Sequence, residues 1–238
     1  FYVKEVKAPA GFVTTEEVKE FTFEYAGADV PEVTFEHTFE NEATIFEITK
    51  SDLTTGVELD GATLTVLDKD GNEIDKWTSV KGEPHIIKRL HVGETYILRE
   101  EFAPYGYLKA EEVEFTITDT AEIQKVEMKD DVPIGRIIIN KKGEFLSEVS
   151  WNDMVAGAMD SIWGYVTGSL KDVTFEIYAR EDIKAADGES DDYYKKDELV
   201  ATIKTDELGI ARTDDLPLGK YYVVEKETAD GFVLDGEP

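Results

Sequence analysis

Short segments of alternating polar and apolar residues recur along the chain. The alternation is strict over residues 44–50, 62–67 and 113–117. A period of two places every second side chain on the same face of a strand, so these segments predict β-strands with one buried face. Asp70-Gly71 lies between two such segments and suits the positive φ angles of a tight hairpin turn. We therefore expect an all-β fold of antiparallel sheets packed as a sandwich.

Residues 144–170 break this pattern, because their aromatic and apolar residues lack clean alternation. A short helix or a wide hairpin would fit this segment. Trp151 and Trp163 could form a surface that binds a ligand or a partner. The other interpretation, which we favour, is an insertion folded over the core of its own domain.

One phrase occurs three times, with a Gly six residues after a Glu and an aromatic residue directly after the Gly. The three Glu residues are Glu5, Glu100 and Glu225. The copies lie on the order of 100 residues apart, whereas solenoid repeats need units of roughly 20 to 50 residues. Each copy therefore predicts one domain of an array.

Composition limits the classes of function. The chain of 238 residues suits about two domains of ordinary size, and 53 acidic against 25 basic residues give a formal charge of −28. This charge repels phosphate backbones and anionic membranes, so we expect no nucleic-acid partner. The absence of cysteine excludes disulfides, thiol catalysis and zinc–cysteine sites.

No membrane insertion, metal or cofactor is expected either. No apolar run reaches transmembrane length, and no signal peptide or anchoring tail is recognisable, so we expect export and attachment signals outside this segment. His37, His85 and His91 lack metal-ligand spacing, and residues 68–73 lack the spacing of a calcium loop. The latter segment is expected to be a hairpin turn.

Several phrases in a fixed order resemble a known family. They are Ile48-Thr49-Lys50-Ser51-Asp52, residues 60–64, the phrase from Glu100 to Tyr107, and residues 126–130. Together they resemble the Cna B-type, or SpaA-type, domains of Gram-positive surface adhesins and pilins, over nearly the whole chain. This resemblance implies tandem immunoglobulin-like, transthyretin-like (CnaB) β-sandwich domains. It also implies a covalent bond between a Lys on the first strand and an Asn or Asp on the last, promoted by a Glu.

The family pattern falls on Lys50, Glu100 and Asp130, which implies an isopeptide bond between Lys50 and Asp130. Burial lowers the pKa of a lysine and raises that of a carboxylic acid, so a protonated Glu100 can polarise the Asp130 carbonyl for attack by a neutral amine. Close contact supplies the effective concentration. The reaction is a single self-crosslinking turnover, so the chain is not expected to be an enzyme.

The same pattern divides the chain into three parts. Residues 1–43 resemble the C-terminal part of a domain, with Glu5 and the acceptor Asn41 on a last strand over residues 33–41, and with the Lys expected upstream. Residues 44–132 resemble a complete domain. Residues 133–238 resemble a domain with an insertion at about 144–170 that lacks its last strand. In this third part, Lys141 fits the alternation better than Lys142 as the reactive lysine. The resemblance implies that Glu225 promotes the bond.

Two functions remain open. The first, which we prefer, is a structural stalk or pilin-like segment of an extracellular protein, attached to the cell wall or secreted, whose partners are neighbouring domains of the same longer chain. The alternative is a ligand-binding adhesin module, or an accessory module of a secreted carbohydrate-active enzyme, that contacts a host protein or a glycan. The strand bearing Asn41 could also complete the third unit of another molecule at Lys141, giving head-to-tail polymers. We favour the simpler interpretation that the sequence belongs to a longer array.

Overall fold

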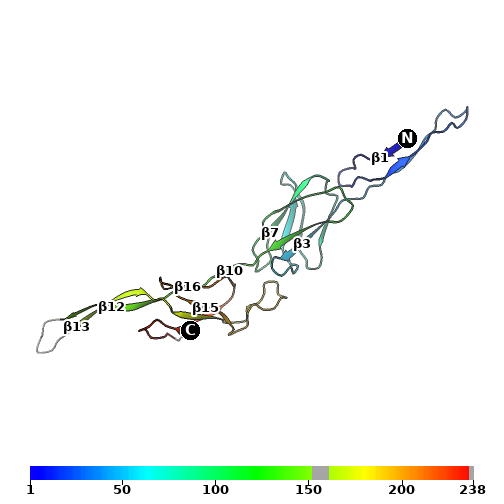
Figure 1. Cartoon of the computed structure of the whole chain (residues 1–238). Coiled ribbons are helices and arrows are strands. Elements are labelled where there is room, and N and C mark those ends of the chain that lie inside the picture. Colours follow the sequence, from blue (N-terminus) through cyan, green and yellow to red (C-terminus); the bar gives the residue numbers. More distant parts are fainter. Residues whose placement is uncertain (152–160, 236–238) are drawn as a thin grey trace. The chain divides into compact units, whose positions relative to one another are not determined.

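The computed structural model describes residues 1–151 and 161–235, with side chains described outside residues 148–163. The described residues form strands, turns and loops and contain no helix, which confirms the predicted all-β fold. No helix in this part of the chain is therefore long and apolar enough to cross a membrane. The chain divides into two compact units, Phe1–Asp131 and Val132–Pro238 (Figure 1).

The strands of the first unit are β1 (Tyr2–Lys4), β2 (Val18–Glu20), β3 (Ile45–Asp52), β4 (Thr63–Leu67), β5 (Glu73–Thr78), β6 (His85–Lys88), β7 (Thr95–Phe102), β8 (Val113–Thr116) and β9 (Gln124–Asp130). Strands β1 and β2 pair with each other. The remaining strands form a three-stranded sheet in the order β6-β3-β9 and a four-stranded sheet in the order β5-β4-β7-β8. Strand β9 runs parallel to β3, and the other pairs are antiparallel.

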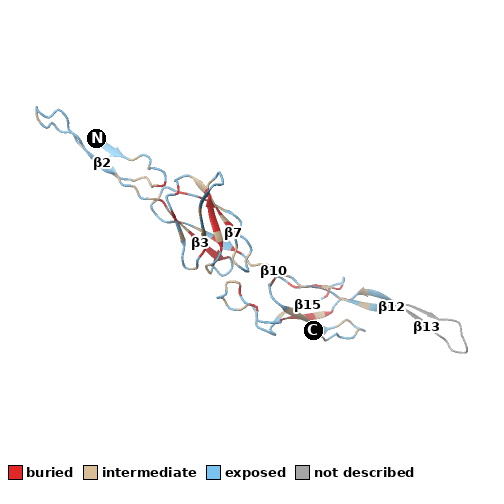
Figure 2. Cartoon of the chain, turned by 180° about the vertical axis from the view of Figure 1, so that it is seen from behind, coloured by how far each residue is buried: buried red, intermediate tan, exposed pale blue. Residues whose placement is uncertain are grey.

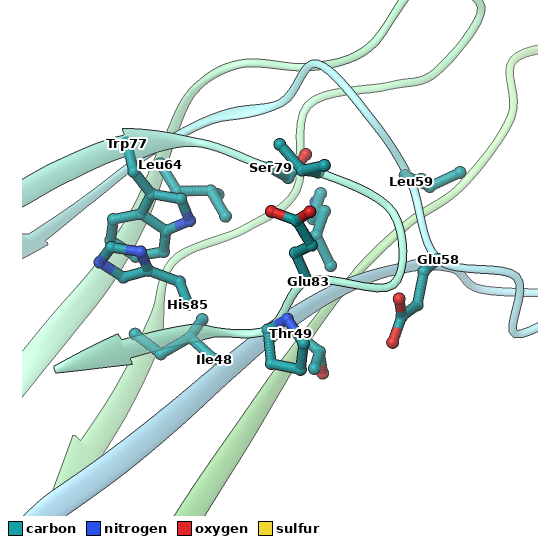
Figure 3. A pocket seen from close by; sticks show the side chains of 12 residues that line it. Ile48, Thr49, Glu58, Leu59, Leu64, Trp77, Ser79, Glu83 and His85 are labelled. Atoms are coloured by element: carbon teal, nitrogen blue, oxygen red, sulfur yellow. The ribbon is translucent and has the colours of Figure 1, made fainter.

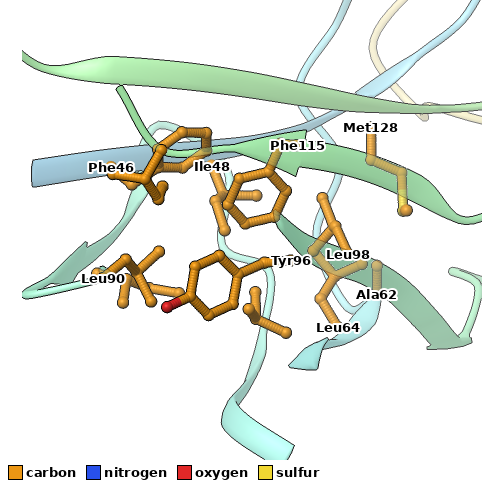
Figure 4. Packing of buried hydrophobic residues seen from close by; sticks show 12 residues of the cluster. Phe46, Ile48, Ala62, Leu64, Leu90, Tyr96, Leu98, Phe115 and Met128 are labelled. Carbon is orange, nitrogen blue, oxygen red and sulfur yellow. The ribbon is translucent and has the colours of Figure 1, made fainter. Parts of the chain in front are cut away.

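The core of this unit lies between its two sheets. Buried residues gather in β3 and β7 (Figure 2), where every second side chain faces inward, as the alternation predicts. Phe46 stacks on Phe115 with ring centroids 4.3 Å apart, and Leu98 is completely buried. Figure 4 shows this cluster of buried residues, which comprises Phe46, Ile48, Ala62, Leu64, Val66, Ile87, Leu90, Tyr96, Leu98, Phe115, Ile117 and Met128. The predicted hairpin between β4 and β5 is present, and Gly71 has a φ of 84°.

The segment before β3 contacts this sandwich at Arg89 and through the Thr14 N–H, which donates to Asp119 Oδ1 at 2.9 Å. Phe12 pairs with Ala43, and the Arg89 guanidinium lies 5.2 Å from the centroid of the Phe12 ring. Gly11 has a φ of 83°, and a Cβ atom there would lie 2.7 Å from the Arg89 carbonyl oxygen. This close approach of two backbones requires glycine.

The strand predicted over residues 33–41 differs from the structure. These residues belong to no β-ladder, although their side chains stack in an aromatic row. Phe35 lies 4.6 Å from Phe21, and His37 lies 4.8 Å from Phe39, between ring centroids. A β-strand needs a hydrogen-bonded neighbour, and no strand of the described residues pairs with this segment as β3 pairs with β9. Alternation in residues 33–41 is therefore compatible with the aromatic row, but it does not by itself produce a β-ladder.

The strands of the second unit are β10 (Ile134–Gly135), β11 (Ile138–Asn140), β12 (Lys142–Trp151), β13 (Ser161–Ser169), β14 (Thr174–Ala179), β15 (Leu199–Lys204), β16 (Ile210–Arg212), β17 (Leu216–Pro217) and β18 (Tyr221–Glu227). They form a sheet in the order β15-β14-β18 and the pairs β11-β16, β10-β17 and β12-β13. A small core surrounds Leu170, Val173 and Phe175.

The segment 144–170 contains the β12-β13 hairpin, one of the two forms that its sequence allows. A register shift between Leu146 and Glu148 explains why the alternation is not clean. The base of the hairpin packs on the domain, because Phe145 contacts Phe232 edge-on with ring centroids 5.3 Å apart. Trp151 and Trp163 lie in the two strands, but their side chains are outside the described residues, so their proposed binding role stays a prediction.

Candidate crosslinking site

The structure brings Lys50, Glu100 and Asp130 together inside the sandwich of the first unit. The Lys50 Nζ atom donates a hydrogen bond to Asp130 Oδ1 and lies 3.1 Å from Glu100 Oε1. The exposed fractions of the three side chains are 1%, 0% and 0%. A lysine and two carboxyl groups are thus enclosed without water at a distance that suits both ion pairing and reaction.

Strand geometry explains how three residues so distant in sequence meet. Lys50 follows Phe46 and Ile48 on the inner face of β3, and Glu100 continues the inner face of β7 on the opposite sheet. In the parallel β3-β9 pair, Lys50 is opposite Met128, and Asp130 is the next inward residue of β9. The polar groups therefore occupy positions that an apolar core residue would otherwise fill.

Burial governs the charge of this cluster. It raises the pKa of Asp130 to about 6, against the lowering effect of Lys50 and with the help of the neighbouring Glu100 carboxyl. Asp130 Oδ2 is buried without a hydrogen-bond donor among the described residues, whereas Glu100 Oε1 faces the Lys50 Nζ atom. Burial therefore favours the protonated form of Asp130.

The backbone holds Glu100 in place. The Ala110 N–H donates to Glu100 Oε2 at 2.7 Å. The N-terminal copy repeats this contact ten residues after its own glutamate, since the Thr15 N–H donates to Glu5 Oε2 at 2.8 Å. In both copies the donor lies ten residues after the glutamate. This spacing was not recognised in the sequence, because the donors are backbone N–H groups of Ala110 and Thr15, whose side chains give no sign of the contact.

Asn41 occupies the place in the N-terminal copy that Asp130 has in the complete domain. Its Nδ2 atom donates to Glu5 Oε2 at 2.6 Å and to the Val13 carbonyl at 2.9 Å. The Val13 N–H in turn donates to the carbonyl of Glu42, as the Leu108 N–H donates to the carbonyl of Asp131, both at 2.8 Å. No lysine of the described residues forms an ion pair with Glu5.

The second unit contains the Lys–Glu half of the site. Lys141 Nζ donates to Glu225 Oε2 at 2.6 Å, and the exposed fractions of the two side chains are 24% and 3%. Glu225 Oε1 is buried, and no donor of the described residues faces it. Among those residues no Asp or Asn side chain joins the pair. The preference for Lys141 over Lys142 thus agrees with the contact to Glu225.

A small hollow lies beside Lys50 in the first unit. Trp77 and His85 stack face to face on one side of it, with ring centroids 3.9 Å apart, and Ser79 and Glu83 lie on another side (Figure 3). Its free volume of about 10 Å³ is near that needed by one water molecule and far too small for a glycan or peptide. We therefore assign no ligand to this hollow.

Comparisons with known proteins agree with this fold. A family described as the SpaA prealbumin-like fold domain matches residues 44–132 and 165–238, which together make up more than half of the chain. The chain belongs to this family. A search of curated protein sequences finds no match.

Solved structures add one informative likeness. The Bacillus anthracis TIE protein is 27% identical over 99% of this chain, with a TM-score of 0.51. The present chain spans only 37% of the length of the TIE chain. BcpA, the major pilin subunit of Bacillus cereus, is 12% identical, with coverage of 82% of this chain and 91% of that chain and a TM-score of 0.34. The C-terminal domain of the shaft pilin SpaA from Lactobacillus rhamnosus GG is 18% identical, with coverage of 38% and 98% and a TM-score of 0.29.

Proposed function

We propose that this chain is a stalk or pilin-like segment of a Gram-positive cell-surface protein, stiffened by isopeptide bonds that its own side chains form. The observation that carries the proposal is the enclosed cluster of Lys50, Glu100 and Asp130. Membership of the SpaA family supports it. The location on the cell wall or in the extracellular medium is part of this proposal.

The proposed reaction needs no external reagent. In the dry site, a proton passes from the Lys50 ammonium to a carboxylate, which leaves a neutral amine and a carboxylic acid. The amine nitrogen attacks the Asp130 carboxyl carbon while a protonated Glu100 donates a hydrogen bond to the carbonyl oxygen. A C–N bond forms, the C–O bond of Asp130 breaks, and the leaving hydroxyl departs as water with a proton from the nitrogen. The products are one amide and one water.

Topology gives this bond a mechanical role. Strands β3 and β9 are adjacent and parallel, and the chain enters the sandwich at the start of β3 and leaves it at the end of β9. A bond from Lys50 to Asp130 carries a pulling force directly between these strands and leaves the intervening residues unloaded. It also restricts the unfolded chain over a loop of 80 residues, which stabilises the domain by on the order of 4 kcal/mol.

The test is the intact mass of the denatured protein. We expect the chain to be lighter than its sequence by one water, and peptide mapping should place the loss in the linked segments that contain Lys50 and Asp130. Lys50→Ala and Glu100→Ala should restore the full mass. Lys129→Ala, which changes an exposed lysine next to Asp130, is the matched control and should keep the loss. A wild-type chain of full mass would rule the proposal out.

A second function is favoured by the exposed side of the β12-β13 hairpin. Leu146 and Tyr165 are paired on one face of the hairpin and are each at least half exposed, and apolar side chains gathered at the surface commonly mark contact sites. On this proposal the hairpin, with Trp151 and Trp163 further along its strands, contacts a host protein or a glycan. Loss of binding by Tyr165→Ser or Trp163→Ala in a chain of unchanged melting temperature would support it.

A further inference from the structure

Residues 107–110 touch all three strands that bring the reactive side chains together. This segment follows β7 and lies outside the regular strands. It contacts the end of β3 through the Tyr107 side chain, the end of β9 through the Leu108 N–H, and the Glu100 carboxyl group through the Ala110 N–H. We call residues 107–110 the clasp.

The contact with β3 is made through Asp52. The Tyr107 hydroxyl donates to Asp52 Oδ2 at 2.8 Å, and Asp52 is buried on the same face of β3 as Lys50, two residues further on. The other oxygen of Asp52 accepts the N–H groups of Thr54 and Thr55, at 2.7 Å and 2.8 Å. Burial alone would raise the pKa of Asp52, but the hydrogen bonds from Thr55, Tyr107 and Thr54 lower it below the ordinary value.

The two buried aspartates at the ends of β3 and β9 therefore differ in character. Asp52 and Asp130 are opposite each other in the parallel register. Asp52 has donors at both oxygens and is held as an anion, which is a poor target for an amine. Asp130 has one buried oxygen without a donor among the described residues. Only Asp130 thus has the environment of a reactive acid.

Two of the three clasp contacts recur in the N-terminal copy, whereas the third does not. Val13 and Thr15 repeat the backbone contacts of Leu108 and Ala110. The residue equivalent to Tyr107 is Phe12, which has no hydroxyl group, and in the second unit it is Phe232. The hydroxyl contact is thus an addition specific to the domain that holds all three reactive groups.

We infer that Tyr107 is a positioning residue for bond formation, because its hydrogen bond to Asp52 fixes the Lys50 end of β3 to the loop that orients Glu100. This inference rests on the proposed function of the site. Without the hydroxyl, the clasp still contacts Glu100 and the residue after β9, and β3 keeps its ladder with β9, but Asp52 loses its direct link to the loop that orients Glu100. A displacement of about 1 Å is enough to slow a reaction between held groups by up to on the order of a hundredfold.

The test follows the rate at which the 238-residue chain loses water after cell-free synthesis. Samples are quenched in denaturant, and the linked peptide containing Lys50 and Asp130 is quantified by mass spectrometry. Tyr107→Phe should slow its formation by on the order of tenfold. Tyr105→Phe removes a fully exposed hydroxyl two residues away and should leave the rate unchanged.

Further variants separate positioning from general stability. Asp52→Ser keeps an oxygen that can cap the turn at Thr54 but cannot reach Tyr107, so it should slow the reaction as Tyr107→Phe does. The double variant should be no slower than the slower single one. Ile117→Val trims a buried side chain elsewhere in the core and controls for lost stability, with melting temperatures compared in a Lys50→Ala background.

The possible results distinguish the positioning role of Tyr107 from the proposed crosslink itself. A Tyr107→Phe chain that reacts as fast as Tyr105→Phe, or that is slowed no more than an Ile117→Val chain of equal melting temperature, would overturn the inference and leave the crosslink intact. A wild-type chain that never loses water would overturn both. Slowing by Tyr107→Phe and Asp52→Ser without additivity would support the clasp.

Discussion

The Lys–Glu pairs of the two units are built from the same parts but have different surroundings. Lys50 and Glu100 are enclosed with Asp130, whereas Lys141 is a quarter exposed and has Glu225 as its ion-pair partner among the described residues. The difference follows from one strand. Strand β9 pairs with β3 and covers Lys50, but in the described part of the second unit β11 pairs only with β16.

This comparison shows that contact between a lysine and a glutamate is not enough for the proposed chemistry. The Lys141–Glu225 distance of 2.6 Å is shorter than the 3.1 Å between Lys50 and Glu100. What the first unit adds is a third strand that supplies both an acceptor and the exclusion of water. In the proposed reaction, the acceptor strand would therefore exclude water from the site as well as supply the carboxyl group.

The largest expected difference between the units comes from removing each glutamate. Glu100→Ala should abolish the loss of water and lower the free energy of unfolding of the first unit by on the order of 4 kcal/mol, since the crosslink is lost. Glu225→Ala should leave the mass unchanged, because Lys141 lacks an acceptor among the described residues. Intact mass and thermal unfolding measure the two effects.

The same experiment bears on head-to-tail linkage. If the segment bearing Asn41 completed the second unit of another molecule, bond formation would release one ammonia, and denaturing electrophoresis would show a ladder of linked chains. That ladder should disappear in Lys141→Ala and in Asn41→Ala. We expect monomers in size-exclusion chromatography, because Lys141 remains accessible to water.

A smaller effect is expected from pH in a chain that cannot form the bond. In Lys50→Met, burial still raises the pKa of Asp130 above its ordinary value of 3.8, and removal of the cation raises it further. The folded state then binds a proton more tightly than the unfolded state, so stability falls as the pH rises from about 4 to above 6. The loss should be on the order of 3 kcal/mol, at about 1.4 kcal/mol for each unit of pKa.

Chemical denaturation at several pH values measures this slope. The double variant Lys50→Met with Asp130→Asn is the control, and its stability should fall less over the same range. An equal slope in both chains would mean that Asp130 is not the group responsible, and would weaken the contrast drawn between the dry and the exposed site.

Much of this arrangement could be predicted from the sequence, because strand period and side-chain face are local properties. The alternation through Phe46 and Ile48 placed Lys50 on the inner face of β3, and Asp70-Gly71 predicted the β4-β5 turn. The family order then selected Glu100 as the partner. The covalent bond itself stays a prediction.

The rest depends on contacts that no local pattern encodes. Residues 33–41 alternate, yet form no ladder, since a ladder needs a neighbouring strand. The bulge near Leu146 left both a helix and a hairpin open for this segment, because one shifted residue reverses the alternation. The role of Asp52 was missed although it lies two residues from Lys50, because only the fold brings the Tyr107 hydroxyl to it.

The smallest effect concerns the lysines themselves, outside any covalent bond. Lys141→Met leaves the buried Glu225 carboxyl without its cation, but water can reach the quarter-exposed position and replace part of the interaction. We therefore expect the second unit to lose about 1 kcal/mol of stability.

Lys125→Met breaks a surface pair with Glu47, where Lys125 is 67% exposed, and should cost less than about 0.5 kcal/mol. Thermal unfolding measured with added salt distinguishes the two, since screening weakens the surface pair and leaves the partly buried one largely unchanged. Equal losses in the two variants would mean that the Lys141–Glu225 pair behaves as an ordinary surface contact, and that enclosure by a third strand is needed even for a stable ion pair.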